Sequence, residues 1–317
     1  MQGVVLAAGQ GKRLQPLTGT RSKAMMPIAG KPIVERVMEL IALGGVDDFI
    51  LVVAPQDREI EQYFQREAAL QANVRFVYQA ARKGMAHALL QAAPLINGDF
   101  FLSACDNLVS AESIANVCAF WQTEPRPNAI LTLMPTTVER ICSGATVGLE
   151  GVWVTRIIEK PKPEEILSNL ASLPLYAFTP RILDYLPEVQ PSPRGEYELQ
   201  DAIQKLIARD GRVGAVVLES RMTLTNAADL LALNLAYLHS ETGAPHLQPE
   251  AVGPHTHFVT PVRVESGVVI GAHCAIGPNV YLEHGCCIGN GAVLRDAVVL
   301  RGAAVADGET VVEQVIG

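Results

Sequence analysis

The sequence has few aromatic and charged residues and no long apolar run. Aromatic side chains make up 5% and charged side chains 18% of the 317 residues, and the formal net charge is -8. A nucleic-acid-binding surface needs positive charge and usually stacking rings, so this composition argues against that class of protein. The longest apolar stretches stop well short of the roughly 20 residues that span a bilayer, so we expect no transmembrane helix and no membrane partner.

The sequence also lacks the cysteine spacing that is typical of metal and redox sites. None of the six cysteines belongs to a Cys-x-x-Cys motif, which argues against a zinc site or a dithiol redox site. In the N-terminal MQGVVLAAGQGKR the positive charges follow the apolar residues, the reverse of a secretory signal, so we expect a cytoplasmic protein with reduced thiols. Hydrophobic residues make up 49% of the chain, and the length favours about two domains.

Residues 1 to about 240 alternate short β-rich runs with amphipathic segments of helical length. This pattern predicts an α/β fold with a mostly parallel sheet. A helix is expected over Pro32–Leu43, and the long loop Gly9–Gly30 precedes it. Ligands of open α/β sheets bind at the carboxyl ends of strands, so this loop is the first candidate site. The expected strands are Gly3–Ala8, Phe49–Ala54, Val74–Gln79, Phe100–Cys105 and Ile130–Met134.

The periodicity changes to six residues in the last fifth of the chain. An apolar residue returns at every sixth position from Val252 to Val312, eleven times without an insertion. Hexapeptide repeats of this kind predict a parallel β-helix. The expected division of the chain is therefore an α/β domain over 1–243, a linker over 244–251 and a β-helix over 252–317.

One loop concentrates glycines and cations after the first expected strand. It reads LAAGQGKRLQPLTGTRSKAMMPIAGKP and carries Gly9, Gly11, Arg13 and Lys23. Glycines let backbone N–H groups approach an anion closely, and two fixed cations can neutralise a polyphosphate. The spacing excludes a Walker A motif, and Leu14 stands at the third glycine position of a dinucleotide fingerprint. A phosphate-binding loop of another kind is therefore expected.

The whole string resembles the opening motif of the sugar-1-phosphate nucleotidyltransferases: Leu-Ala-Ala-Gly-x-Gly-x-Arg-Leu, Pro-Leu-Thr, a Lys and Pro-x-x-Gly-Lys-Pro. This family includes glucose-1-phosphate thymidylyltransferases and N-acetylglucosamine-1-phosphate uridylyltransferases. The resemblance implies a Rossmann-like domain with a mostly parallel mixed sheet, followed by a short left-handed hexapeptide β-helix. It also implies that the loop wraps a nucleoside triphosphate, with Lys23 where the two substrates meet and Arg13 on the phosphates. The implied nucleotide-binding residues of the loop are Leu6, Ala8, Gly9, Gly11 and Arg13.

Four further segments carry the same resemblance. QAARKGMAHALLQAAP is similar to the family's base-contacting stretch, which implies that Gln79 and the backbone near Gly84 contact the nucleobase. CDNLVS resembles its Gly-Asp-Asn motif and makes Asp106 the implied Mg²⁺ ligand. IIEKPKP resembles its sugar-binding Glu-Lys, which implies that Glu159 binds the sugar hydroxyls and that Lys160 binds the sugar phosphate. GEYELQDAIQKLIARDGR is similar to a segment of the uridylyltransferases.

Several positions depart from the family pattern. Met85 adds bulk in the base-contacting stretch, Cys105 replaces the glycine before the metal-binding aspartate, and Pro174 stands where members use an Asn-x-Gly segment. Thr223 aligns with a second metal-binding aspartate. A hydroxyl is a poor substitute for a carboxylate around a hard cation. The uridylyltransferase branch uses an Asn just downstream, so the resemblance implies that Asn226 serves through its carbonyl oxygen, and we prefer it to Thr223.

These observations predict a Mg²⁺-dependent enzyme that transfers a nucleoside monophosphate from UTP or dTTP to glucose-1-phosphate or N-acetylglucosamine-1-phosphate and releases pyrophosphate. No protein nucleophile is needed, because catalysis would rest on positioning and charge stabilisation. Two alternatives stay open: a catalytically weakened regulatory homologue that binds a nucleotide sugar, and a hexapeptide-repeat acyltransferase. We expect residues 252–317 to hold a homo-oligomer together and to do no chemistry.

Overall fold

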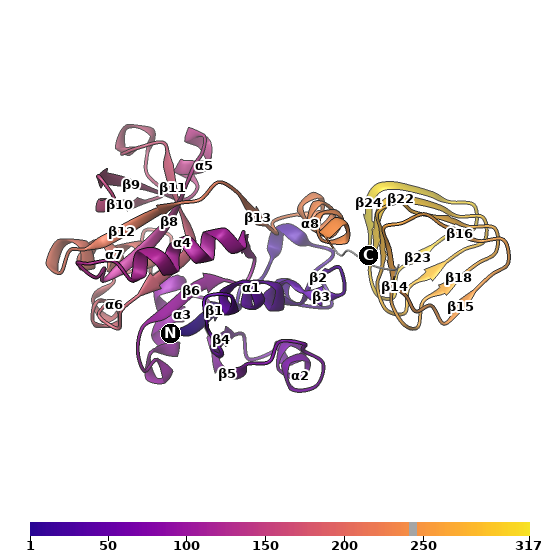
Figure 1. Cartoon of the computed structure of the whole chain (residues 1–317), viewed down its shortest axis with the longest axis horizontal. Helices are drawn as coiled ribbons and strands as arrows, with labels where there is room; N and C mark the ends of the chain where they lie inside the picture. Colours follow the sequence, from indigo (N-terminus) through magenta and orange to yellow (C-terminus); the bar gives the residue numbers. More distant parts are fainter. Residues whose placement is uncertain (241–245) are drawn as a thin grey trace. The chain divides into compact units, whose positions relative to one another are not determined.

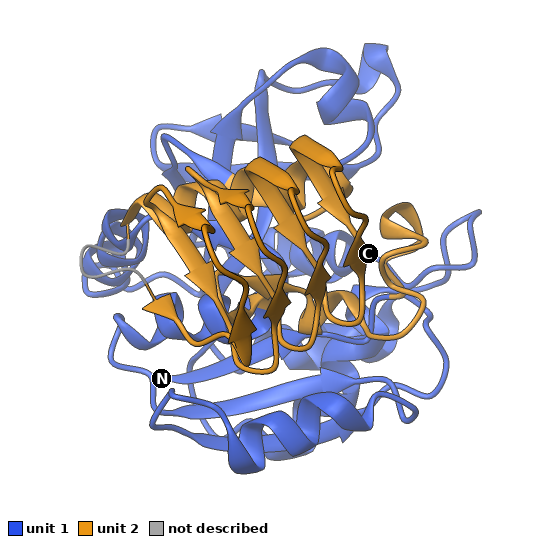
Figure 2. Cartoon of the chain, turned by 90° about the vertical axis from the view of Figure 1, so that its right-hand side faces the viewer, with its two compact units in different colours: residues 1–9, 34–221 blue, residues 10–33, 222–317 orange. Residues whose placement is uncertain are grey.

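The computed structural model describes residues 1–240 and 246–317 (Figure 1). It divides into two compact units. The first comprises residues 1–9 and 34–221, and the second comprises residues 10–33 and 222–317 (Figure 2). The glycine-rich loop thus belongs to the second unit, with the C-terminal strands. The expected domain boundary at residue 243 and the expected linker over 244–251 stay predictions. Residues 243 to 245 lie outside the described residues.

A nine-stranded mixed sheet forms the first unit, in the order β5-β4-β1-β6-β11-β8-β12-β10-β9. β5, β4, β1 and β6 are parallel neighbours, and β11 runs antiparallel to both β6 and β8. All five expected strands are present, with ends that shift by no more than two residues. The strands are β1 Gln2–Leu6, β4 Asp48–Val53, β5 Asn73–Tyr78, β6 Phe100–Ala104, β8 Ala129–Pro135, β9 Ala145–Glu150, β10 Trp153–Glu159, β11 Leu170–Phe178 and β12 Val213–Val217.

Helices and short 3-10 turns connect these strands. The expected helix over Pro32–Leu43 is confirmed as α1, Ile33–Ala42. The other α-helices before residue 222 are α2 Arg58–Arg66, α3 Met85–Ala92, α4 Ala111–Trp121, α5 Val138–Cys142, α6 Ile182–Tyr185 and α7 Leu199–Arg209. The 3-10 turns are Lys12–Leu14, Lys23–Met25, Ala93–Leu95, Pro163–Glu165 and Leu186–Glu188.

The α7 helix shows how the sequence places a functional side chain. Leu199, Ile203 and Leu206 recur at helical spacing and are fully buried against the sheet. Gly211 ends the helix in a left-handed conformation, and its N–H donates to the Leu206 carbonyl oxygen at 3.1 Å. Because these contacts fix α7, its N-cap residue Glu198 is held at a defined position.

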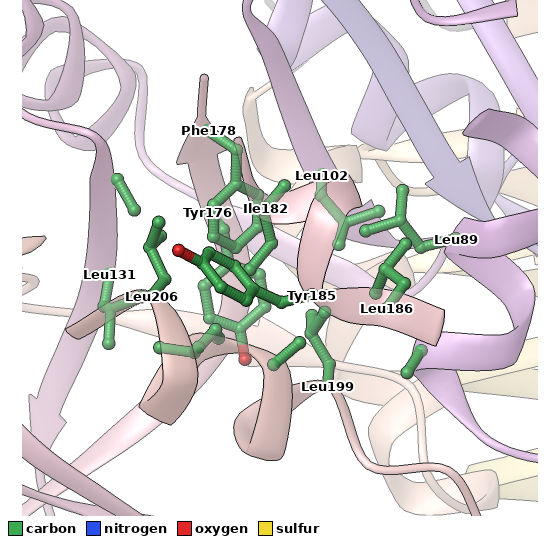
Figure 3. Packing of buried hydrophobic residues seen from close by; sticks show 14 of the residues in the cluster. Leu89, Leu102, Leu131, Tyr176, Phe178, Ile182, Tyr185, Leu186, Leu199 and Leu206 are labelled. Carbon is green, nitrogen blue, oxygen red and sulfur yellow. The ribbon is translucent and has the colours of Figure 1, made fainter. Parts of the chain in front are cut away.

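The core of the first unit lies between the sheet and helices α3, α6 and α7 (Figure 3). Tyr176 and Phe178 of β11 stack with ring centroids 5.5 Å apart. Leu89 of α3 and Leu206 of α7 belong to the same buried cluster. Burying each such side chain contributes roughly 1.5–3 kcal/mol to folding, so this cluster fixes the sheet that carries the loops described below.

Helix α8, Ala227–Ser240, and a stack of coils make up most of the second unit. Strands of successive coils pair in parallel, in the orders β15-β18-β21-β23 and β14-β17-β20-β22-β19-β16, with β24 on β22. The strands are β14 His246–Leu247, β15 Ala251–Val252, β16 His257–Phe258, β17 Val262–Val264, β18 Val269–Ile270, β19 Ala275–Ile276, β20 Val280–Leu282, β21 Cys287–Ile288, β22 Val293–Val299, β23 Ala304–Val305 and β24 Thr310–Ile316. Short strands elsewhere are β2 Pro27–Ile28, β3 Lys31–Pro32, β7 Asn107–Val109 and β13 Arg221–Thr223.

The predicted run of eleven uninterrupted hexads is wrong after Leu294. Paired positions are 18 residues apart in the first coils, as in Val262 with Val280, but 17 apart later, as in Val280 with Ala297. The internal core of the last coils is therefore formed by Val299, Val305 and Val311. Of the predicted positions, Leu300 is buried outside that core, Ala306 is exposed and Val312 is half-buried. Each of these core residues is followed by another apolar residue, Leu300, Ala306 or Val312. A six-residue period therefore finds an apolar residue whether or not one coil is a residue shorter, and the sequence does not reveal the shorter coil.

One outer face of the coils is also buried. Tyr281 and Val298 are neighbours in register on β20 and β22, and both are almost completely inaccessible. Helix α8 contacts β20, β22 and β24. The coils of the second unit therefore have an internal core and a second apolar contact layer.

Among the described residues, no helix is long and apolar enough to cross a membrane.

Candidate active site

The carboxyl ends of β1, β4 and β6 meet at one edge of the sheet in the first unit. Ala7 N–H donates to the Val52 carbonyl oxygen at 2.8 Å, and Cys105 N–H donates to the Leu6 carbonyl oxygen at 3.1 Å. Because the three strands are parallel, the residues that follow them share this edge. Asp106, directly after Cys105, therefore lies at the same edge as the loop after β1.

The loop after β1 is tied to the loop before α3. Arg82 Nε donates to the Ala8 carbonyl oxygen at 2.6 Å. Ala8 is buried, Arg82 and Gly9 are exposed, and the position of a Cβ on Gly9 has open space around it. Sequence reasoning missed Arg82. The adjacent cations Arg82 and Lys83, just before Gly84, could have indicated it, but in this stretch we considered only Gln79 and Gly84.

Gln79 braces the turn that leads into α3. Its buried Nε2 donates to the Gly84 carbonyl oxygen at 3.1 Å and lies 3.0 Å from His87 Nδ1. Burial lowers the pKa of His87, with a smaller contribution from Lys83, which favours the neutral ring that can accept this hydrogen bond. Contact of Gln79 with a nucleobase stays a prediction.

Gly84 is required by backbone geometry. Its φ is 98°, and a Cβ on it would come 2.5 Å from the Tyr197 carbonyl oxygen. Tyr197 N–H donates to the Lys83 carbonyl oxygen at 2.7 Å, so the two segments approach closely. Met85, which we expected to add bulk beside a base, packs against the buried core of the first unit.

Asp106 has a cationic neighbour that the sequence did not indicate. Burial lowers the pKa of the half-buried Arg221 guanidinium, and the charge of Asp106 acts against this effect. Such coupling requires the two groups to be close, because exposed charges beyond about 10 Å are screened. The first unit therefore places an arginine beside the carboxylate that the family resemblance assigns to metal binding.

Glu159 is the most perturbed carboxyl group of this region. Burial is the main cause that raises the pKa of Glu159 to about 7, and the charge of Glu198 adds to it. Lys160 and Arg194 act in the opposite direction. The buried Glu198 accepts hydrogen bonds at Oε1 from Arg194 Nη2 at 2.6 Å and from Ser192 Oγ at 3.0 Å. A carboxyl group with a strongly raised pKa is typical of a functional site.

Tyr176 connects these two groups of charges. It is fully buried, and burial raises the pKa of Tyr176 to about 12. The charge of Glu159 raises the pKa of this phenol further, and the charge of Arg221 lowers it. Pro174, two residues earlier in β11, lies where the register between β11 and β8 is irregular, as expected for a residue without an N–H group.

Lys160 is exposed and adopts a left-handed backbone with φ of 44°. Its N–H donates to the Gly144 carbonyl oxygen at 2.5 Å, which holds this conformation. A non-glycine residue in this region of φ carries strain, and such strain gathers at functional sites. The geometry is compatible with the expected role of Lys160 at the sugar phosphate, which stays a prediction.

The second unit holds the remaining expected site residues. Gly11 has φ of 60°, and a Cβ on it would come 3.0 Å from Lys23 Cβ, so the two ends of the phosphate loop pack closely. Thr18 Oγ1 donates to the Gly11 carbonyl oxygen at 3.3 Å. Arg13 is exposed and Lys23 half-buried. The loop therefore presents one accessible guanidinium on a folded backbone.

Asn226 caps helix α8. Its Oδ1 accepts from Asp229 N–H at 3.0 Å, and Asp229 Oδ2 accepts from Asn226 N–H at 3.2 Å. Thr223 is half-buried. In the described part of the chain, no three His, Cys, Asp or Glu side chains are placed to hold a metal ion.

An α/β fold with a glycine-rich loop after its first strand, an aspartate at the neighbouring strand end and a perturbed carboxyl group defines the class of nucleotidyltransferases. Residues 2–238 match the family model described as nucleotidyl transferase, and residues 258–317 match the one described as GMPPB C-terminal domain. The chain belongs to the nucleotidyl transferase family.

Named relatives share this family. The UTP–glucose-1-phosphate uridylyltransferase AglF of Haloferax volcanii is 37% identical over 212 residues, which are 67% of this chain and 85% of the relative. A glucose-1-phosphate thymidylyltransferase of Streptomyces antibioticus is 30% identical over 288 residues, 88% of this chain and 77% of the relative. The bifunctional protein GlmU of Methanococcus maripaludis is 32% identical over 240 residues, 75% of this chain but 55% of the relative.

A solved structure agrees with these relatives. UDP-glucose pyrophosphorylase in complex with UDP-glucose matches with a TM-score of 0.68 at 25% sequence identity. The match covers 76% of this chain and 99% of that protein. The Rossmann-like nucleotidyltransferase fold predicted from the sequence is thereby confirmed.

Proposed function

We propose that this nucleotidyltransferase transfers a nucleoside monophosphate from UTP or dTTP to glucose-1-phosphate or N-acetylglucosamine-1-phosphate. The observation that carries the proposal is the shared strand edge of the first unit, where Asp106 follows β6 at the same edge at which the glycine-rich loop follows β1. Groups held at such an edge can stabilise the charge that develops on the transferred phosphate.

An oxygen of the sugar phosphate attacks the α-phosphorus of the nucleoside triphosphate, the bond to the β-phosphate oxygen breaks, and pyrophosphate leaves. Arg13 and Lys23 stabilise the charge that develops on the phosphates. Glu159 accepts hydrogen bonds from sugar hydroxyls, and Lys160 pairs with the sugar phosphate. No covalent intermediate with the protein is required, because both reactants are positioned by binding.

Mg²⁺ is the proposed cofactor. Asp106 offers a half-buried carboxylate at the strand edge, a hard oxygen ligand of the kind Mg²⁺ prefers. Mg²⁺ in such sites uses one or two carboxylates together with substrate phosphates, which fits a site without a preformed cluster of protein ligands. When bound, the ion would supply additional charge stabilisation for the transferred phosphate. Asn226 is the proposed second ligand.

Pyrophosphate release tests this proposal. The purified chain is incubated with each of UTP, dTTP, ATP, CTP and GTP against glucose-1-phosphate, N-acetylglucosamine-1-phosphate and mannose-1-phosphate, with Mg²⁺ or with EDTA. We expect release with UTP or dTTP and a glucose-type sugar phosphate, in Mg²⁺ alone. Nucleotide-sugar binding without release under any condition would favour the regulatory homologue instead.

We also propose that the coils form a left-handed β-helix and that they hold a homo-oligomer together. Val252, Val269 and Val293 are large apolar side chains that are 41–43% exposed on the coils. A contact between subunits would bury this apolar surface. Light scattering of Val269→Asp and Val293→Asp variants tests the assembly, since a charge at a buried contact dissociates it. A cytoplasmic location likewise stays a proposal.

A further inference from the structure

A buried ion pair joins the phosphate loop to the coils within the second unit. Arg21 lies between Arg13 and Lys23 in the sequence, and its side chain is 4% exposed. Its Nη2 donates to Glu283 Oε2 at 2.7 Å, and its Nη1 donates to Glu283 Oε1. Glu283 Oε2 also accepts from Arg301 N–H at 2.8 Å. The pair is bidentate, the geometry that fixes orientation best.

Two more contacts hold the same loop. Asn234 of α8 is fully buried, and it accepts from Ala29 N–H at 2.8 Å and donates to the Pro27 carbonyl oxygen at 3.0 Å. Gly30 has φ of 83°, and a Cβ on it would come 2.4 Å from Arg263 Nε of β17. The loop is therefore attached to α8 and the coils at three separate places along residues 21–30.

Arg21 is not available to a ligand. Both of its terminal nitrogens bond to Glu283, and its Nε is buried without a hydrogen-bond partner among the described residues. A cation that is fully engaged inside the protein does not bind phosphate itself, but it sets the backbone from which its neighbours project. Arg13 is exposed eight residues before it and Lys23 follows two residues after it.

We propose that Glu283 and Arg21 form a positioning pair for nucleotide binding, so that the coils set the conformation of the phosphate loop. This inference rests on the proposed function, because it assigns the loop to the nucleoside triphosphate. It extends the expected role of the coils from assembly to the binding of one of the two substrates.

The first test compares Michaelis constants. Glu283→Gln removes the charge that orients Arg21, and we expect the KM for UTP, or for whichever nucleotide the wild type uses, to rise at least about 10-fold. The KM for the sugar phosphate stays within about 2-fold, a split that general destabilisation would not produce. Asp307→Asn is the matched control, because Asp307 accepts from Asn290 N–H at 2.7 Å within the coils and is not bonded to the loop.

A double variant guards against loss of folding. Arg21→Met combined with Glu283→Leu removes both charges, so no unpaired charge is left buried and the protein can keep its stability. We expect this variant to melt near the wild type and still to show the raised KM for the nucleotide. A folded double variant with the wild-type KM for the nucleotide overturns the proposal.

Limited trypsin digestion measures how accessible the phosphate loop is, and it does not depend on enzymatic activity. We expect cleavage after Arg13 and Lys23, followed by mass spectrometry, to be at least about 10-fold faster in the double variant than in the wild type or in Asp307→Asn. Equal cleavage rates overturn the positioning role. A wild type that releases no pyrophosphate refutes the proposed function, whereas this digestion still decides whether the pair positions the loop.

Discussion

The half-buried Glu159 of the sheet unit and the buried Glu283 of the coils lie in opposite electrostatic surroundings. Glu283 in the coils bonds to a buried guanidinium and to a backbone N–H group. Glu159 in the sheet unit lies near Glu198, and burial together with that charge raises the pKa of Glu159 to about 7. Burial of a charge is costly unless partners compensate it. The second unit supplies those partners from the phosphate loop and from the coils. The sheet unit leaves Glu159 only partly compensated, which is typical of a group at a functional site.

Glu283→Gln should have the largest effect on stability. It leaves the buried guanidinium of Arg21 without its counter-charge, and breaking a buried pair in this way costs about 3–5 kcal/mol. Denaturant unfolding measures the loss. A change below about 1 kcal/mol would mean that the two carboxylates do not differ as described.

Asp106→Asn should lower turnover about 100-fold or more, equivalent to about 3 kcal/mol of transition-state stabilisation, with little change in melting temperature. Asp99→Asn is the matched control, because Asp99 lies just before the opposite end of the same strand, β6, and bonds to Trp121 Nε1 at 3.3 Å. Steady-state pyrophosphate release compares them. Equal turnover in Asp106→Asn and wild type would contradict the site assignment.

Glu159→Gln should have the opposite sign from Glu283→Gln. A carboxyl group whose pKa rises from about 4.5 to about 7 on folding binds more protons in the folded state, so it weakens stability as the pH rises from 4.5 to 7. The amide should therefore stabilise the protein by about 3 kcal/mol at pH 8 and by almost nothing at pH 4.

Activity should respond to the same group. Because ionised Glu159 is the better acceptor for sugar hydroxyls, the KM for the sugar phosphate should fall as the pH rises through about 7, and Glu159→Gln should abolish that dependence. Urea unfolding and KM profiles over pH 4–9 provide the readouts. A variant that is destabilised equally at both pH values would remove the contrast with Glu283.

The smallest effect tests the phase of the last coil. Val311→Ala removes a buried side chain and should cost about 1–2 kcal/mol, whereas Val312→Ala next to it should cost less than about 0.5 kcal/mol. Thermal unfolding of the two variants measures the difference. A larger cost for Val312→Ala than for Val311→Ala would restore the uninterrupted six-residue phase that the sequence suggested.

The predictable part of the site consists of residues at strand ends. Asp106 follows a strand that the apolar run Phe100–Cys105 indicated, and the glycine-rich loop follows the first strand, so both could be assigned in advance. Arg82 and Arg221 could not, since each reaches a partner far away in the sequence through its side chain. Such contacts depend on how loops fold over the sheet, and no periodicity reports them.

The sequence by itself determined the two kinds of architecture, because alternating β-rich and helical segments and a six-residue period each fix which side chains face inward within an element. Only the tertiary structure decided the 17-residue spacing of the last coils and the attachment of the phosphate loop to α8 and the coils. The physical reason is separation along the chain. Arg21 and Glu283 are 262 residues apart, and their pairing follows from the packing of complete elements, which local patterns do not encode.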